Sequence, residues 1–225
     1  MTPPSTPQEM LQQLYDQTLV GNAPEVLGLT QQALEMGMEP QSLLFDALIP
    51  SLEEVGARFE RGDFFVPEML IAGRAMAGAM EVLRPLLAET GVQTIGKFLM
   101  GTVKGDVHDI GKNLVNIMLE GAGFEVIDLG VQVAPETFVA KIVEHEPDIV
   151  GFSAFLTTTM PMFKANLNAL QKAGLRDSVI VMVGGAPVTQ EYADAVGADG
   201  YASDASATVK RAKDLLHRKR ALVDA

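Results

Sequence analysis

Residues of a type that could carry chemistry gather in one short segment, residues 105–113, which has the sequence GDVHDIGKN. The segment holds two carboxylates and one of the three histidines of the chain, in the order Asp106-x-His108-Asp109. Side chains two positions apart in an extended segment point the same way. We therefore expect the Asp106 carboxylate to hydrogen-bond one ring nitrogen of His108, which leaves the other nitrogen free to bind a metal.

Three functional interpretations of this segment compete. A phosphate loop of the type G-x-x-x-x-G-K-[ST] is rejected, because the gap from Gly105 to Gly111 is one residue too long and Asn113 replaces the Mg²⁺-binding hydroxyl. A hydrolytic metal site needs more ligands, and the remaining histidines, His145 and His217, are not expected near the segment. The third is a single axial ligand to a metal whose other ligands come from a macrocycle. On the pattern alone, a histidine that only hydrogen-bonds within its loop is an equally good interpretation.

Two later segments favour the macrocycle interpretation. Ser153 and the hydroxyl run Thr157–Thr159 follow the third predicted strand, and Gly184-Gly185 follows the fourth. The carboxyl ends of parallel strands meet at one sheet edge, which is where open α/β sheets bind ligands. Small residues there let a ligand approach the backbone closely. Threonines bonded to their own backbone and glycines in a tight turn are the structural alternatives, but three such features at one edge favour a ligand site.

The second half of the chain positions these segments, because strand and helix patterns alternate there. Apolar runs predict five strands, at residues 97–103, 124–129, 149–154, 179–183 and, weakly, 200–202. Helices are predicted between and after them at 110–121, 135–144, 160–173, 189–196 and 206–218. Five such units predict an α/β fold with a Rossmann-like (flavodoxin-like), doubly wound, five-stranded parallel sheet covered on both faces.

The first half has a helical pattern throughout. One predicted helix carries its apolar residues at spacings of three and four, namely Leu44, Leu48, Leu52, Val55 and Phe59. The other predicted helices cover residues 8–20, 24–36 and 69–87. Four helices with short links predict a small bundle. The pattern changes between Pro85 and Thr94, so we expect a helical-bundle cap domain over residues 1–90, a Rossmann-like domain over residues 91–225, and a hinge between them.

Composition narrows the classes of partner. The chain of 225 residues is 48% apolar and has 17 basic against 29 acidic residues, for a net charge of −12. Such acidity argues against nucleic acid and against an anionic membrane surface as partners. The absence of cysteine excludes disulfides, zinc–thiolate sites and iron–sulfur clusters. No apolar run is long enough to span a bilayer, and the first residues do not have the pattern of a signal peptide. We expect a cytoplasmic protein.

Taken together, the motifs resemble those of the cobalamin-binding proteins of the methionine synthase type. The resemblance is strongest to the small corrinoid proteins that serve methyltransferases in methylotrophic methanogens and acetogens. The family pattern DxHxxG, SxL and GG reads here as Asp106-x-His108-x-x-Gly111, Ser153-x-Phe155 and Gly184-Gly185. A helical cap before a Rossmann-like domain also belongs to this family. Phe155 departs from the pattern, because the family has leucine there, and we expect it to alter the packing around the buried nucleotide tail of the cofactor.

The resemblance implies a role for each matching residue. His108 would be the catalytic lower ligand of cobalt, in place of the cofactor's own base. Asp106 would polarise His108, and the Thr159 hydroxyl would extend the hydrogen-bond relay that begins with these two residues. The implied cofactor-binding residues are Asp106, Val107, His108, Asp109, Ile110, Gly111, Ser153, Phe155, Thr157, Gly184, Gly185, Tyr201, Ala202 and Ala205. Contacts to the upper face of the cofactor are expected from the cap. Its candidates are Phe64, Met69 and Leu70, for which burial in the bundle core is at least as good an expectation.

The resemblance also implies a function, that of a corrinoid methyl carrier. Such a protein takes a methyl group onto cobalt from a substrate-specific methyltransferase and delivers it to a second methyltransferase acting on a folate or a thiol, with a reductive activase as a further partner. A cobalamin-binding sensor or regulator without methyl transfer is the alternative. A phosphoryl-accepting receiver on the same topology is disfavoured, because residues 153–159 after the third strand contain no carboxylate.

Overall fold

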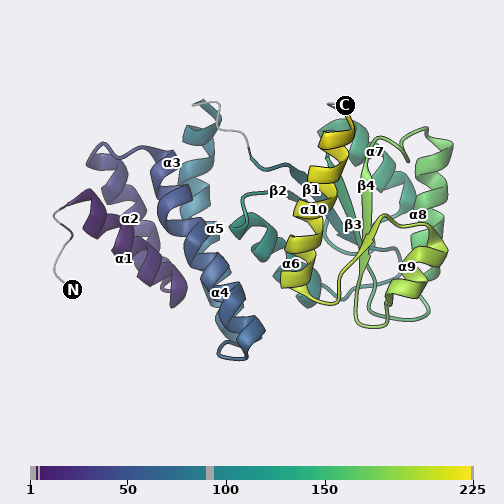
Figure 1. The fold of residues 1–225 in the computed structure, drawn as a ribbon, viewed down its shortest axis with the longest axis horizontal. Coiled ribbons are helices and arrows are strands. Elements are labelled where there is room, and N and C mark those ends of the chain that lie inside the picture. The colour runs from purple at the N-terminus through teal and green to yellow at the C-terminus, as the bar shows by residue number, and fades with distance from the viewer. Residues whose placement is uncertain (1–3, 5, 90–93, 224–225) are drawn as a thin grey trace. The chain divides into compact units, whose positions relative to one another are not determined.

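The computed structural model describes residues 4, 6–89 and 94–223, which divide into two compact units (Figure 1). The first unit takes in the described residues within Met1–Gln93 and Glu120–Gly123, and the second those within Thr94–Leu119 and Phe124–Ala225. Pro85, which was expected at the hinge, lies inside a helix that continues to Glu89. Residues 90–93 of the expected hinge lie outside the described residues.

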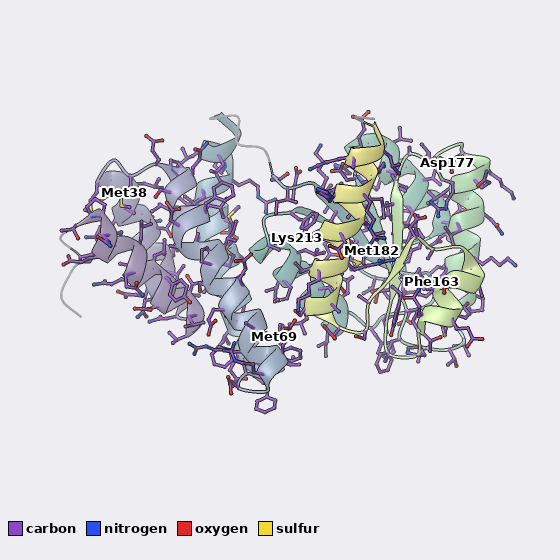
Figure 2. The ribbon with its side chains drawn as sticks, viewed as in Figure 1. Met38, Met69, Phe163, Asp177, Met182 and Lys213 are labelled. Atoms are coloured by element: carbon purple, nitrogen blue, oxygen red, sulfur yellow. The ribbon has the colours of Figure 1, made fainter. Side chains whose placement is uncertain are left out.

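The first unit is built from helices. They are α1 (Pro7–Leu19), α2 (Ala23–Glu35), α3 (Pro40–Leu43), η1 (Leu44–Leu48), α4 (Ile49–Arg61) and α5 (Val66–Glu89). The start of α1 is set by a capping box, in which Thr6 Oγ1 accepts the Glu9 N–H and the Glu9 carboxylate accepts the Thr6 N–H, both at 3.2 Å. The apolar stripes meet in a core that includes the fully buried Met10, Leu14 and Met69. Met69 is labelled in Figure 2. The bundle predicted from periodicity is therefore present.

The third predicted helix is not one regular α-helix, and here the sequence expectation was wrong in detail. Its first residues form the π-helical turn η1, which follows the short α3, and the regular α-helix α4 begins only at Ile49. In the π turn, the N–H of Ile49 reaches back five residues to the carbonyl of Leu44. Pro50 follows immediately and has no N–H to donate, so the regular ladder is interrupted at this point. The prediction of a continuous helix used only the spacing of the apolar residues, and that spacing takes no account of Pro50.

The second unit is a five-stranded parallel sheet in the order β2-β1-β3-β4-β5. The strands are β1 (Lys97–Thr102), β2 (Glu125–Asp128), β3 (Ile149–Ser153), β4 (Ile180–Gly184) and β5 (Gly200–Tyr201). The helices are α6 (Ile110–Gly121), α7 (Pro135–His145), α8 (Pro161–Lys172), α9 (Gln190–Val196) and α10 (Ala205–Val223). Helices α6 and α10 lie on one face and α7, α8 and α9 on the other (Figure 1). The predicted α/β fold with a doubly wound Rossmann-like sheet is confirmed.

The sheet is held by apolar cores on its two faces. On the side of α7 to α9, the buried residues include Phe138 on α7 and Phe163 on α8, which pack with Phe152 of β3. The rings of Phe138 and Phe152 meet edge to face with centroids 4.7 Å apart. Phe163 of this cluster is labelled in Figure 2, as is Met182 of β4, a buried residue that does not belong to the cluster. Among the described residues, none of the helices combines the length and the apolarity needed to cross a bilayer.

Strand register brings three loops to the same edge of the sheet. Thr102 at the end of β1 pairs with Ser153 at the end of β3, and Ser153 pairs with Gly184 at the end of β4. Because the strands are parallel, the loops that follow these residues leave the sheet side by side. The segments singled out from sequence, at residues 105–113, 153–159 and 184–185, therefore begin next to one another.

Candidate metal-cofactor site

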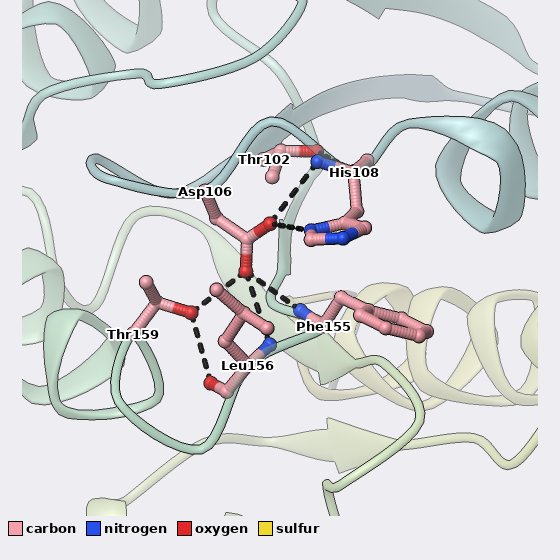
Figure 3. A network of polar contacts seen from close by, with 6 residues as sticks. All are labelled: Thr102, Asp106, His108, Phe155, Leu156 and Thr159. Carbon is pink, nitrogen blue, oxygen red and sulfur yellow. Dashed lines mark hydrogen bonds and ion pairs between the residues drawn. The ribbon is translucent and has the colours of Figure 1, made fainter.

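The centre of the site is the Asp106 carboxylate, which is fully buried. Its Oδ1 accepts hydrogen bonds from the backbone N–H of His108 at 3.1 Å and from His108 Nδ1 at 2.7 Å. Its Oδ2 accepts three more, from Thr159 Oγ1 at 2.7 Å, Phe155 N–H at 2.8 Å and Leu156 N–H at 3.2 Å (Figure 3). The hydrogen bond expected between Asp106 and a ring nitrogen of His108 is therefore present. The same carboxylate also binds the loop after β3.

These hydrogen bonds keep Asp106 ionised. Burial by itself raises the pKa of a carboxyl group, and here it is the largest single influence. The hydrogen bonds from Thr159, from the ring and backbone of His108 and from the Phe155 N–H outweigh it together, and the pKa of Asp106 is held well below its usual range. The site therefore contains a fixed negative charge 2.7 Å from His108 Nδ1.

His108 is oriented so that one nitrogen is held and the other is available. An ionised carboxylate can only accept, so Nδ1 donates the proton and Nε2 of the neutral ring carries the lone pair. Among the described residues, Nε2 has no hydrogen-bond partner, and the side chain is 43% exposed. Thr102 Oγ1 donates to the His108 carbonyl at 3.0 Å, which ties the loop to the end of β1. This is the arrangement in which a carboxylate orients a metal-ligating histidine.

Exposed apolar side chains lie in the two segments that contain or bind Asp106. Val107 is 59% and Ile110 68% exposed in the first segment, and Phe155 is 51% and Leu156 39% exposed in the second. Large apolar side chains left exposed beside an available imidazole nitrogen suit a large, partly apolar ligand better than a hydrated ion. Among the described residues, no cluster of three or more histidine and carboxylate side chains could hold a metal ion.

The glycines also fit a bulky group. Gly185 has φ +133°, and a Cβ there would lie 1.9 Å from the carbonyl oxygen of Ala154, so only glycine is accommodated. Gly111 has open space where its side chain would be, and at Gly184 the nearest atom, the carbonyl oxygen of Ala202, is 3.8 Å away. The residues at this edge therefore combine a free imidazole nitrogen, exposed apolar side chains and glycines that leave the backbone uncovered.

The structure relates the other predicted residues to the site in different ways. Ser153 lies at the edge through its strand register, and Val183, just before Gly184, pairs with Tyr201. Thr157 is exposed, Tyr201 and Ala202 are half-buried, and Ala205 is buried at the start of α10. The Asp109 carboxylate accepts a hydrogen bond from Asn113 Nδ2 at 3.2 Å, and it is not part of the Asp106 cluster.

The cap candidates have different environments within the first unit. Met69 is fully buried, so of its two expected environments the bundle core is the one observed. Phe64 is half-buried, and the Arg58 guanidinium lies 5.1 Å from its ring centroid. Leu70 is half-buried. Phe65, which the sequence analysis did not single out, is 64% exposed.

Sequence reasoning also missed Lys112. Its amine lies 2.5 Å from Asp128 Oδ2 and 2.7 Å from Asn113 Oδ1, and the side chain is 1% exposed. The pair joins the start of α6 to the end of β2. The sequence did contain a signal. Lys112 lies four residues before Asn116, which lies three residues before Leu119, so the three share one face of the helix, and Asn116 and Leu119 are buried. A lysine on a buried stripe needs a partner of opposite charge.

Comparison with known proteins agrees with this geometry. Residues 96–210 match one B12 binding domain family and residues 10–84 match a second. The chain is 42% identical to the dimethylamine corrinoid protein of Methanosarcina barkeri, over 93% of this chain and 98% of that protein. It is 44% identical to trimethylamine corrinoid protein 2 of Methanosarcina mazei, over 82% and 87%.

Solved structures of cobalamin proteins also resemble this chain. The methanol:cobalamin methyltransferase complex of Methanosarcina barkeri contains a chain with a TM-score of 0.80 and 28% identity, over 94% of this chain and 85% of that chain. A cobalamin-binding protein of Desulfitobacterium hafniense has a TM-score of 0.69 and 31% identity, over 89% and 95%.

The fold is a Rossmann-like sheet with an available imidazole nitrogen at its carboxyl edge, as in proteins that bind a metal cofactor there. With matches to B12 binding domains over both halves, the chain belongs to the family of corrinoid proteins, and its cofactor is cobalamin.

Proposed function

We propose that this chain is the methyl carrier of a methyltransferase system. It receives a methyl group from a substrate held by one methyltransferase and passes it to a second methyltransferase that acts on a folate or a thiol. The bound corrinoid supplies a cobalt centre that can take up and release the methyl group. A reductive activase would return the cofactor to its reactive state.

The observation that carries this proposal is the geometry of His108. Its Nε2 is free while Nδ1 is held 2.7 Å from an ionised, buried carboxylate. We infer that Nε2 is the lower ligand of cobalt. Asp106 would keep the Nδ1 proton in place while the ring is a ligand, and it would stabilise the doubly protonated ring when Nε2 is released. Thr159 donates to the other carboxylate oxygen and so holds the carboxylate in position.

The other predicted residues receive proposed roles at the same edge. Ser153 and Thr157 would bind the nucleotide tail, and Gly111, Gly184 and Gly185 would leave room for it. The end of β5 and the start of α10 would close the far side through Tyr201, Ala202 and Ala205. Val107, Ile110 and Phe155 would lie against the macrocycle, and Asp109 would help to fix the loop.

We also propose that the two units correspond to a cap and a cofactor domain with a boundary near residue 90. The cap would shield the methyl group between transfers. It would have to move for a methyltransferase to reach the cofactor, and the segment joining the two units would act as the hinge.

We propose a methylated amine as the donor, because relatives at 41–47% identity are dimethylamine corrinoid proteins. The structural likeness to a chain of a methanol:cobalamin methyltransferase complex supports a methyltransferase as partner. Methanol, methoxylated aromatics, betaines and methylthiols are the other donor classes to compare.

The donor proposal is tested by loading the protein with cobalamin and reducing it under anaerobic conditions. It is then mixed, in separate reactions, with dimethylamine and the methyltransferase that serves the dimethylamine corrinoid protein of Methanosarcina barkeri, and with methanol and the methyltransferase of the methanol:cobalamin complex. We expect the absorbance of the reduced corrinoid to change to that of the methylated corrinoid with dimethylamine alone. Methylation with methanol and its own methyltransferase, and not with the amine, would contradict the donor. A lack of methylation by every donor system would contradict the carrier function.

A further inference from the structure

The stack between His108 and Phe155 is a feature that the proposed function does not explain. The two ring centroids lie 4.4 Å apart, with an angle of 26° between the ring planes (Figure 3). His108 is 43% and Phe155 51% exposed, so the stack lies at the open side of the site and not in a core. The position of Phe155 is also the one at which this chain departs from the SxL pattern.

Asp106 holds both residues of the stack, His108 through its ring and Phe155 through its backbone. The Phe155 N–H donates to Asp106 Oδ2 at 2.8 Å, and His108 Nδ1 contacts Asp106 Oδ1 at 2.7 Å. The buried, ionised Asp106 thus fixes the backbone of one ring and the edge of the other. This common anchor holds Phe155 beside His108 whether or not the two side chains attract each other.

The hydrogen bond and the stack restrict different motions of the imidazole. A hydrogen bond at Nδ1 fixes one point of the ring but still permits the ring to tilt about the line from Nδ1 to Oδ1. A flat ring packed on one face of the imidazole blocks that tilt on its own side. The lone pair of Nε2 lies in the plane of the imidazole, so a group stacked on the face leaves the ligand direction open. A leucine at this position has no flat surface to provide the same restriction.

From this geometry, and resting on the proposed role of His108 as cobalt ligand, we propose that Phe155 is a positioning residue for cobalt ligation. It stacks on the imidazole of His108 and holds the ring plane in the orientation from which Nε2 binds the metal. Because the ring is ordered before binding, less conformational entropy is lost when the bond from Nε2 to the metal forms. An aromatic pair contributes enough to change the ratio of histidine-bound to histidine-free cofactor by about twofold to tenfold.

The first test is a ¹H NMR measurement on the cofactor-free full-length protein, and it does not depend on any activity. The chain has three histidines, and His108→Ala identifies the ring signals of His108. Stacking predicts that these signals are shifted upfield by the ring current of Phe155 and move downfield in Phe155→Leu. Phe45→Leu is the matched control, because Phe45 is another exposed phenylalanine, 44% exposed, in the first unit. Unchanged His108 signals in Phe155→Leu would overturn the proposal.

The second test measures ligation with cobinamide, a corrinoid that lacks the nucleotide tail. We expect Phe155→Leu to lower the histidine-bound fraction, read from the absorbance spectrum, by about twofold to tenfold relative to wild type and Phe45→Leu. An effect seen with cobalamin and absent with cobinamide would show that Phe155 acts on the tail, and it would overturn positioning through His108. An unchanged ratio with both corrinoids would overturn it too.

Failure of the proposed function gives a different result. If the wild-type protein bound neither corrinoid, His108 would not be a cobalt ligand and the positioning role would fall with it. The NMR comparison would still show whether the two rings stack.

Discussion

Replacement of Asp106 by asparagine is the most informative single change, because one buried carboxylate accepts hydrogen bonds from five donors at 2.7 to 3.2 Å. An asparagine of the same shape keeps one oxygen and turns the other acceptor into an NH₂ group. With the oxygen directed at His108, the new NH₂ faces the N–H groups of Phe155 and Leu156, and neither can change its role. The hydroxyl of Thr159 can rotate and accept.

The expected loss of stability follows from the two backbone N–H groups, those of Phe155 and Leu156. A buried donor left without an acceptor costs about 1–3 kcal/mol, so two of them predict a loss of about 2–6 kcal/mol in the free energy of unfolding. Thr159→Val is the graded comparison, because it removes the contact of the hydroxyl with the charged Asp106, worth about 1.5–3 kcal/mol, together with its contact to the Leu156 carbonyl. Turning the asparagine round would place its NH₂ against the backbone N–H and Nδ1 of His108. The imidazole could change tautomer and accept at Nδ1, but the backbone N–H could not, so a flip still leaves one buried donor without an acceptor, at a cost of about 1–3 kcal/mol.

Urea unfolding followed by circular dichroism measures both losses on the full chain. Binding of cobalamin should also weaken, more in Asp106→Asn than in Thr159→Val. Asp106→Asn with wild-type stability would refute the reasoning, because it would mean that the donors around Oδ2 find other acceptors at no cost.

Two further predictions concern pH and a core amide. The pKa of Asp106 is lower in the folded protein than its unfolded value of about 3.9, so its contribution to stability is present above about pH 5 and is lost as the pH falls through 3.9 towards the folded pKa. Urea unfolding between about pH 6 and 3 should therefore show a steeper loss for wild type than for Asp106→Asn, and equal slopes would contradict the assignment. Asn166 on α8 is 1% exposed, and both its amide atoms lack a partner among the described residues. Asn166→Leu should raise the free energy of unfolding by about 1–3 kcal/mol, and a urea midpoint at or below that of wild type would contradict this.

Much of the fold could be predicted, because the second unit has strong local signals. The helix expected at residues 110–121 is observed with those bounds, and the apolar runs mark every strand of the sheet. The π turn before Pro50 could not be predicted from apolar spacing, since the spacing is the same whether the ladder is regular or interrupted. The extent of β5, which is only Gly200–Tyr201, is likewise set by pairing with β4 and not by local sequence.

Only the contacts of the site that depend on side-chain type could be predicted from the sequence. The contact of Asp106 with His108 follows from a spacing of two residues, and that of Thr159 followed from the family pattern. The N–H donors of Phe155 and Leu156 were missed, because any residue supplies a backbone N–H and the loop alone decides where it points. The stack of Phe155 on His108 depends on this same loop.

The central claim, that His108 Nε2 ligates cobalt, is tested most directly by electron paramagnetic resonance of the cobalamin-loaded protein in the Co(II) state. The nitrogen bonded to cobalt splits each cobalt line, as a triplet for ¹⁴N and a doublet for ¹⁵N. In protein labelled with ¹⁵N-histidine and loaded with unlabelled cobalamin, we predict doublets, and we predict that His108→Ala loses them. Triplets that persist in the labelled protein would show that the nitrogen comes from the cofactor's own base, and they would contradict ligation by His108.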